Sequence, residues 1–140
     1  MSESDRTLLL QVVTPDRVVL EERTTSLRAP GVLGSFGILY NHAPFISQLA
    51  IGELRYRATD GRSRRIAVSG GFLQVSDNRV TLLADTAERA DEIDLTRARQ
   101  AVERARSARQ LGASGDQLLA LDRDLERAMN RPRIAETDAD

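Results

Sequence analysis

The 140-residue sequence contains no cysteine, no tryptophan and no lysine, and it has a single histidine. The absence of cysteine excludes disulfides and thiolate metal sites. Because aromatic residues make up only 4% of the chain, its core must be built mainly from aliphatic side chains. Because lysine is absent, every cationic side chain other than the histidine is a planar, permanently charged guanidinium.

Neither sign of charge is in large excess. A formal net charge of −1 gives no electrostatic argument for nucleic acid or anionic lipid as a partner. No apolar run approaches the roughly 20 residues that a membrane-spanning helix needs. The polar residues 1–6 resemble neither a secretory signal nor an Arg-rich transit peptide. We therefore expect a soluble, cytoplasmic protein without direct membrane insertion, which reaches a membrane only through a partner.

The first part of the chain has the pattern of an all-β domain. Glu53–Ala58 alternates strictly, with Leu54, Tyr56 and Ala58 on one side, which is typical of a strand with one buried face. Turn signals recur at about eight to twelve residues, which favours a sandwich or barrel. One of them, Ser69-Gly-Gly71, is expected to break a strand. The sequence predicts a β-sandwich of about ten short strands over residues 1–86.

The composition changes at Ala84, beyond which Ala, Arg, Glu and Leu dominate. Asp94 is a suitable N-cap for a helix that runs to about Leu111, and Asp116 for a second helix that Pro132 should stop. Because residues 112–115 form a short Gly-rich loop, we expect an antiparallel two-helix hairpin over residues 87–140. The Ala-rich seam of its first helix buries little area, so the hairpin should be held weakly and be mobile. Residues 135–140 are expected to be disordered.

Four arginines of the hairpin are predicted to crowd one rim. Arg97 and Arg104 lie on one edge of the first helix, and Arg127 and Arg131 on the matching edge of the second. An antiparallel hairpin brings Arg131 level with Arg97, with the other two within about 10 Å. Such a cluster suits a polyphosphate, which guanidiniums bind in bidentate fashion. From geometry alone, however, a solvated face paired to Glu103, Asp124 and Glu126 is the better interpretation.

Several stretches together carry a resemblance to one family. They are Gly34-Ser-Phe-Gly-Ile38 with Asn41-His-Ala-Pro44, Ser69-Gly-Gly-Phe72, Leu83-Ala-Asp-Thr-Ala-Glu88, Ile93-Asp-Leu-Thr-Arg-Ala98 and Arg127-Ala-Met-Asn-Arg131. In this order, over about residues 8–134, they resemble the epsilon subunit of the bacterial F-type rotary ATP synthase. The chain departs from the pattern at Ser35, where many relatives carry an acidic residue.

The resemblance implies a non-catalytic regulator. The sandwich would bind the gamma subunit of the central stalk and rest on the ring of membrane c subunits, at the cytoplasmic face of the plasma membrane. The hairpin would either dock on the sandwich or extend along the stalk to the alpha and beta subunits and inhibit ATP hydrolysis. Ser35, Phe36 and His42 are expected at a subunit interface. The resemblance also implies a proton-translocating complex.

The resemblance further implies a regulatory ATP site in the hairpin, and with it ATP binding becomes the favoured interpretation of the arginine cluster. The expected ligand-binding residues are Glu88, Ile93, Asp94, Arg97, Ala98, Arg104, Arg127 and Arg131. Asp94 would accept hydrogen bonds from the nucleoside, and Ile93 and Ala98 would supply apolar surface for the base. ATP is expected as a regulatory ligand and not as a required cofactor.

Catalysis and metal binding have no candidate residues. His42, the single histidine, precedes Ala43-Pro44 in a turn, where a structural or interface role is expected. There is no Walker-type phosphate loop, and Asp91, Glu92 and Asp94 suit a helix N-terminus better than a metal site. The alternatives are a free-standing adaptor that grips another protein without a nucleotide, and a small hydrolase. The hydrolase lacks a nucleophile–base pair.

Overall fold

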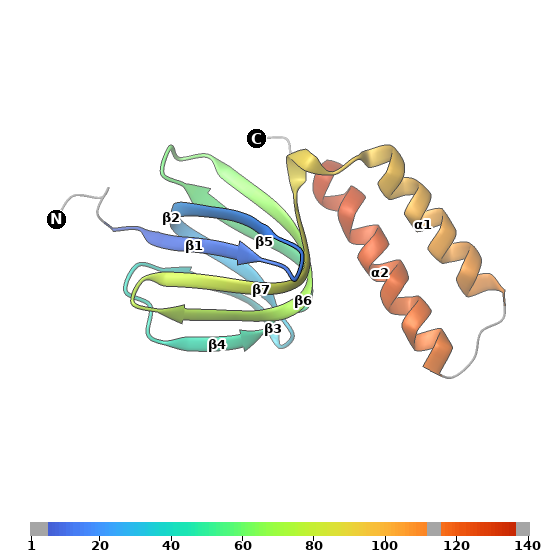
Figure 1. Ribbon diagram of the computed structural model, residues 1–140, viewed down its shortest axis with the longest axis horizontal. Helices are drawn as coiled ribbons and strands as arrows, with labels where there is room; N and C mark the ends of the chain where they lie inside the picture. Colours follow the sequence, from blue (N-terminus) through green and yellow to red (C-terminus); the bar gives the residue numbers. More distant parts are fainter. Residues whose placement is uncertain (1–5, 112–115, 137–140) are drawn as a thin grey trace.

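The computed structural model describes residues 6–111 and 116–136, and within them it has a β-sandwich followed by two helices (Figure 1). The predicted fold class, two modules with a sandwich and a helical hairpin, is confirmed. The strands are β1 (Leu8–Val13), β2 (Val18–Gly31), β3 (Gly34–Leu39), β4 (Phe45–Gln48), β5 (Ile51–Ala58), β6 (Ser63–Ser76) and β7 (Arg79–Arg89). The 3-10 turn η2 (Ala90–Glu92), α1 (Leu95–Gln110) and α2 (Asp116–Glu136) follow.

The strands join in the order β1-β7-β6-β5-β2-β3, and β4 pairs with β6. Because β1 also pairs with β2, the sheet closes on itself. Every pair is antiparallel except β1 with β7. The described residues contain seven strands and not about ten, because β2 and β6 each continue for 14 residues.

The expected break at Ser69-Gly-Gly71 was wrong. Strand β6 passes through this segment, and its pairing with β7 continues from Ser69–Thr86 to Gly71–Ala84. Gly70 and Gly71 have φ angles of +71° and +104°, which residues with a side chain rarely adopt. The two glycines therefore let the strand bend without leaving the sheet. The expected boundary at residue 86 lies within β7, which runs on to Arg89.

The core follows from strand alternation. In β1 the side chains of Leu8, Leu10 and Val12 are fully buried, and their neighbours are only partly covered. In β5 the predicted inner face of Leu54, Tyr56 and Ala58 is confirmed. Since a strand exposes alternate residues to opposite faces, the intervening arginines of β5 lie on the outside of the sandwich.

Tyr56 is the one phenol within this core, and its hydroxyl donates to Oε2 of Glu22 at 2.7 Å. Burial, followed by the hydrogen bond to Glu22 and the charge of that carboxylate, raises the pKa of Tyr56 far above that of a free tyrosine.

Above about pH 10 the unfolded chain loses the phenol proton of Tyr56, whereas the folded chain keeps it. We therefore expect stability to fall as the pH rises above 10. Urea unfolding over this range should show a smaller fall for Tyr56→Phe; equal slopes would contradict the prediction.

The first helix begins as predicted. Asp94 is the N-cap of α1, and its side chain accepts a hydrogen bond from the backbone N–H of Arg97 at 3.1 Å. The end predicted for the second helix was wrong, because Pro132 lies inside α2, which continues to Glu136. The proline removes one backbone donor. Burial of Ile134, which is 2% exposed, stabilises the turn that follows.

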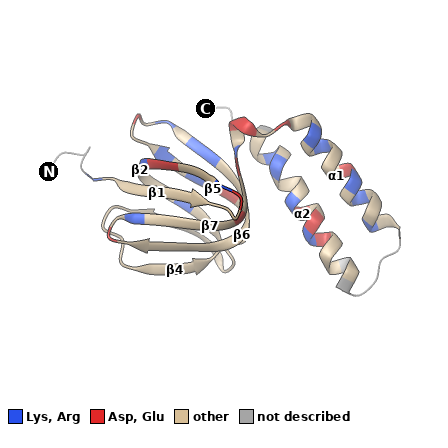
Figure 2. Ribbon diagram, viewed as in Figure 1, with Lys and Arg blue, Asp and Glu red and all other residues tan. Residues whose placement is uncertain are grey.

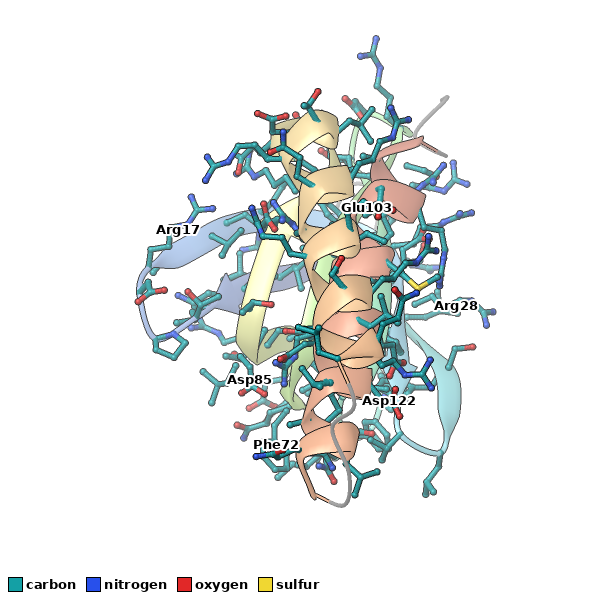
Figure 3. All side chains as sticks on the ribbon, turned by 90° about the vertical axis from the view of Figure 1, so that its right-hand side faces the viewer. Arg17, Arg28, Phe72, Asp85, Glu103 and Asp122 are labelled. Atoms are coloured by element: carbon teal, nitrogen blue, oxygen red, sulfur yellow. The ribbon has the colours of Figure 1, made fainter. Side chains whose placement is uncertain are left out.

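Two predictions concern the ends of the hairpin. Residues 135 and 136, expected to be disordered, belong to α2. Residues 137–140 and the predicted Gly-rich loop at 112–115 lie outside the described residues. In Figure 1, α2 lies between the sandwich and α1, and Figure 3, seen from the hairpin side, places α1 in front of α2. The hairpin therefore covers the sandwich with α2.

Candidate functional site

A groove between α2 and the strands β6 and β7 contains several of the predicted ligand-binding residues. Its volume is about 310 Å³, and Glu88, Arg127 and Arg131 are among the residues that line it. Arg131 forms an ion pair with Glu88, with Nε 2.5 Å from Oε1 and Nη2 donating to Oε2 at 3.1 Å. Both side chains are about two thirds buried, at 30% and 34% exposure. This pair joins the helical module to the sandwich.

Asn130 lies in the same groove and was missed by the sequence analysis. It is 5% exposed, and its Nδ2 donates to the carbonyl of Gly52 at 2.9 Å and to that of Val68 at 3.5 Å. A buried amide with both donors engaged is specific to one position of α2 on the sandwich. The sequence could have indicated Asn130 by its spacing, because it lies four residues before the apolar Ile134 and therefore on the same face of the helix.

Two of the predicted residues, Ile93 and Ala98, are brought together in an apolar cluster. They pack with Ile134 of α2 and with Ala67 and Ala90 of the sandwich side. Ile93 is 8% exposed and Ala98 is fully buried. In this docked arrangement the apolar surface expected to receive a base is therefore covered by the hairpin itself.

The predicted arginines of α1 lie on the outside of the hairpin. Arg97 and Arg104 are exposed on α1, and Arg104 lines a shallow depression with Thr96, Arg99, Gln100 and Glu103. Arg127 donates to Oδ1 of Asp124 at 3.3 Å. The structure thus brings Arg127, Arg131 and Glu88 to one groove, whereas Arg104 lines a different surface. Figure 2 shows the many charges of the two helices.

The predicted interface residues lie at the β3 end of the sandwich. Phe36 and Phe45 stack edge to face with ring centroids 5.2 Å apart, and His42 lies 5.5 Å from Phe45. His42 Nδ1 also hydrogen-bonds the carbonyl of Ala43 at 2.7 Å. The oxygen of Ser35 accepts from Arg28 at 3.4 Å. Aromatic packing therefore orders the loop between β3 and β4.

A second surface was not foreseen, an apolar patch on the outer face of β4, β6 and β7. Phe72 pairs directly with Leu83 across β6 and β7, and Ile46 lies on the same face of β4. These three side chains are 53%, 57% and 68% exposed, respectively. Figure 3 shows Phe72 on the outside of the molecule, and Figure 2 shows β4 free of charged residues. Patches of this kind mark protein interfaces more often than free surface.

Within residues 6–111 and 116–136 no group of three or more carboxylates or histidines could hold a metal ion. In the same part of the chain no helix combines the length and apolarity needed to span a bilayer. The chain is therefore a two-module protein, a sandwich with a docked hairpin, whose candidate surfaces are the groove between the modules and the exposed apolar patch.

The chain belongs to the family of ATP synthase delta/epsilon chains. The family model for the β-sandwich domain of the delta/epsilon chain of ATP synthase matches residues 7–90. An ATP synthase epsilon chain of Syntrophomonas wolfei is 41% identical over 136 residues, which cover 97% of this chain and 98% of the relative. An epsilon chain of Nitratidesulfovibrio vulgaris (strain DP4) is 52% identical over 101 residues, 72% of this chain and 75% of the relative.

Solved structures agree with this assignment. A chain in the mitochondrial ATP synthase of Euglena gracilis, determined as the OSCP/F1/c-ring part, has a TM-score of 0.77 and 26% identity, with 94% of this chain and 81% of that chain covered. A chain in the central stalk and c-ring of the Tetrahymena thermophila enzyme has a TM-score of 0.56 at 17% identity, covering 95% and 96% of the two chains, and shows the shared fold.

Proposed function

We propose that this chain is a rotor subunit of a bacterial proton-translocating ATP synthase, and that its hairpin inhibits ATP hydrolysis when it leaves the sandwich. The family membership and the likeness to a chain in the OSCP/F1/c-ring part of a solved ATP synthase support the first part. The partners would be the gamma subunit, the ring of c subunits and, for the extended hairpin, the alpha and beta subunits. The chain would lie peripherally at the cytoplasmic face of the plasma membrane.

The observation that carries the regulatory part is where the described residues attach the hairpin to the sandwich. These contacts lie near the end of α2: the Asn130 amide, the Arg131–Glu88 ion pair and the Ile134 cluster. The opposite end of the hairpin is closed on itself by the pair Arg109–Asp122, with Nε and Oδ1 2.5 Å apart. Because the Ile134 cluster is separate from the main core, the hairpin can leave without disturbing that core.

The exposed surfaces of the sandwich support the proposed partners. The apolar patch Ile46–Phe72–Leu83 and the aromatic loop of Phe36, Phe45 and His42 lie outside the region that α2 covers. The three side chains of the patch are exposed, and exposed apolar side chains are costly in a free protein and become buried in a stable assembly. We assign the loop to the contact with the c ring and the patch to the rotor stalk.

ATP would act by stabilising the docked hairpin. The groove offers two guanidiniums, Arg127 and Arg131, beside the acceptor Glu88. Arg131 is paired with Glu88, so a nucleotide phosphate would exchange one anionic partner of this arginine for another. A ligand shifts the docking equilibrium only by its differential affinity for the two states. Loss of ATP would then favour the extended, inhibitory state.

Arg127→Ala should weaken ATP binding to the isolated chain by tens of fold, on the order of 2 kcal/mol, because a phosphate loses a charged donor. Isothermal titration calorimetry measures this directly. Arg123→Ala, which removes an exposed arginine one turn earlier on α2, is the matched control and should bind ATP as wild type does. If the wild-type chain ignores millimolar ATP, the ligand proposal fails and the family membership stands.

The inhibitory role is tested by locking the hairpin. Since the chain has no cysteine, the double variant Ala67→Cys/Ile134→Cys introduces a single possible disulfide between two positions of one packed cluster. The oxidised variant, assembled into the complex, should hydrolyse ATP at the uninhibited rate, and reduction should restore inhibition. Each single-cysteine variant should not respond to oxidation. Hydrolysis that is equal in the oxidised and reduced double variant would contradict the proposal.

A further inference from the structure

The outer face of β3, β2, β5 and β6 aligns arginines across the strands. The register places Arg28 of β2 opposite Arg55 of β5, and Arg55 opposite Arg65 of β6. Arg57 follows two residues after Arg55 on the same face of β5. Like charges directly opposite one another in a sheet destabilise it. Such a row requires a source of negative charge.

The described part of the chain supplies little of that charge. Glu53 is shared, with its Oε1 3.0 Å from Nε of Arg55 and 3.5 Å from Nε of Arg65. Arg28 donates to the hydroxyl of Ser35, and Arg57 donates to the carbonyl of Gly61 at 2.9 Å. Both of these acceptors are neutral. Among the described residues no carboxylate lies within ion-pair distance of Arg28 or Arg57.

The same face is hollowed. A shallow groove of about 370 Å³ is lined by Arg28, Arg55 and Arg57 and by the small residues Ser26 and Gly37. Leu39, 64% exposed, lies at its border on β3. Figure 3 shows Arg28 extending outward beside the hairpin. We refer to Arg28, Arg55, Arg57 and Leu39 as the arginine groove.

We propose that the arginine groove is an interaction surface for an acidic segment of a protein partner, one that carries at least two carboxylates and an apolar side chain. The proposal rests on the proposed function, because it places the partner in the same rotary complex. Neighbouring strands lie about 4.8 Å apart, and alternate residues of a strand about 6.7 Å. Carboxylates on adjacent turns of a helix, about 5–6 Å apart, match this spacing.

A protein segment fits the groove better than a small phosphate ligand. The guanidiniums come from two strands and line an open, shallow surface, so no single phosphate could meet all three. Arg binds carboxylates in bidentate fashion, and the exposed Leu39 adds an apolar contact that a phosphate cannot use. Electrostatic pairing of this kind sets the orientation of the bound partner and the rate at which the two proteins associate.

The test measures binding of the full chain to the purified complex of the source organism from which this subunit has been removed. Arg28→Glu/Arg57→Glu is compared with Arg23→Glu/Arg79→Glu, a control that makes the same change of charge. The control arginines are exposed, and both lie opposite Leu9 of β1, outside the groove. The groove variant should lose tenfold or more in affinity and show a weaker salt dependence. The control should change affinity by less than threefold.

The possible outcomes distinguish failure of the arginine-groove proposal from failure of the proposed function. Equal losses for the two double variants, or no loss for the groove variant, would overturn the arginine groove and leave the proposed function in place. If the wild-type chain does not bind the depleted complex, the proposed function itself fails, and the groove proposal with it. Wild-type binding to phosphatidylglycerol vesicles that the groove variant loses would assign the groove to lipid instead. Thermal unfolding of each variant checks folding, and Arg28→Gln/Arg57→Gln replaces a variant that fails to fold.

Discussion

Replacing Gly71 with alanine is expected to lower the free energy of unfolding by about 3 kcal/mol or more. A Cβ at this position would overlap the carbonyl oxygen of Leu83 and lie 2.8 Å from Cα of Ala84. The φ angle of +104° adds backbone strain of roughly 1–2 kcal/mol, and forcing the β6–β7 pair apart adds a similar cost. Because β6 bends at Gly71 while it stays paired with β7, a Cβ there meets backbone atoms of β7. Urea unfolding of the isolated chain measures the change.

Gly61→Ala is the matched control for backbone strain. Gly61 also has a positive φ, +88°, but a Cβ there would meet no atom within 4 Å. We expect this variant to lose only about 1 kcal/mol, the part that comes from the backbone alone. If Gly71→Ala and Gly61→Ala lose the same amount, close packing against β7 is not what requires glycine at position 71.

Ile134→Ala is expected to release the hairpin from the sandwich. The other members of its cluster include three alanines, Ala67, Ala90 and Ala98, so Ile134 supplies much of the apolar area that docking buries. Truncation of a buried isoleucine costs roughly 2–5 kcal/mol, and even the lower value reduces the ratio of docked to undocked hairpin about 30-fold. The main core should keep its stability, because Ile134 packs in a separate cluster.

Limited trypsin digestion measures this release, since α1 and α2 carry many arginines that docking protects in part. Cleavage within the hairpin should accelerate by about the same factor as the undocked population rises. Leu119→Ala, which truncates a leucine that is 61% exposed on α2, should leave the cleavage rate unchanged. Similar rates for wild type and Ile134→Ala would show that the remaining contacts suffice for docking.

The groove residues connect this docking contact to the proposed ligand. Arg131 holds the hairpin through Glu88 and is also one of the two guanidiniums proposed to bind ATP. Ile93 and Ala98, proposed to meet the base, are covered by Ile134. For ATP to stabilise docking as proposed, its phosphates and base would have to hold the end of α2 more tightly than the Glu88 pair and the Ile134 contact that they replace. This coupling would allow a nucleotide bound at that end to control the position of both helices.

Local interactions made several features predictable. The alternation of Glu53–Ala58 predicts which face of β5 is buried, because side chains point to opposite sides of any strand. The Asp94 N-cap and the helix start that follows depend on a hydrogen bond between residues three apart. The separate motifs were enough to indicate the family, since each reflects a turn, a cap or a helix face that forms within a few residues.

Other features depend on which distant segments meet. Pro132 would end an isolated helix. Helix α2 continues because Ile134, two residues later, is buried against Ala67 of β6, Ala90 of η2 and Ala98 of α1. Asn130 has no predictable partner until α2 is placed on the carbonyls of Gly52 and Val68. The row of arginines exists only through the register of β2, β5 and β6.

The sequence by itself therefore determined the two modules, the inner face of β5 and the family, because these follow from periodicity and from contacts within one or two turns of the chain. Only the tertiary structure decided where the hairpin docks, which arginines share a groove and which side chains of the expected ligand site are covered. Those depend on strand register and helix placement, which are set by packing between residues far apart in the chain.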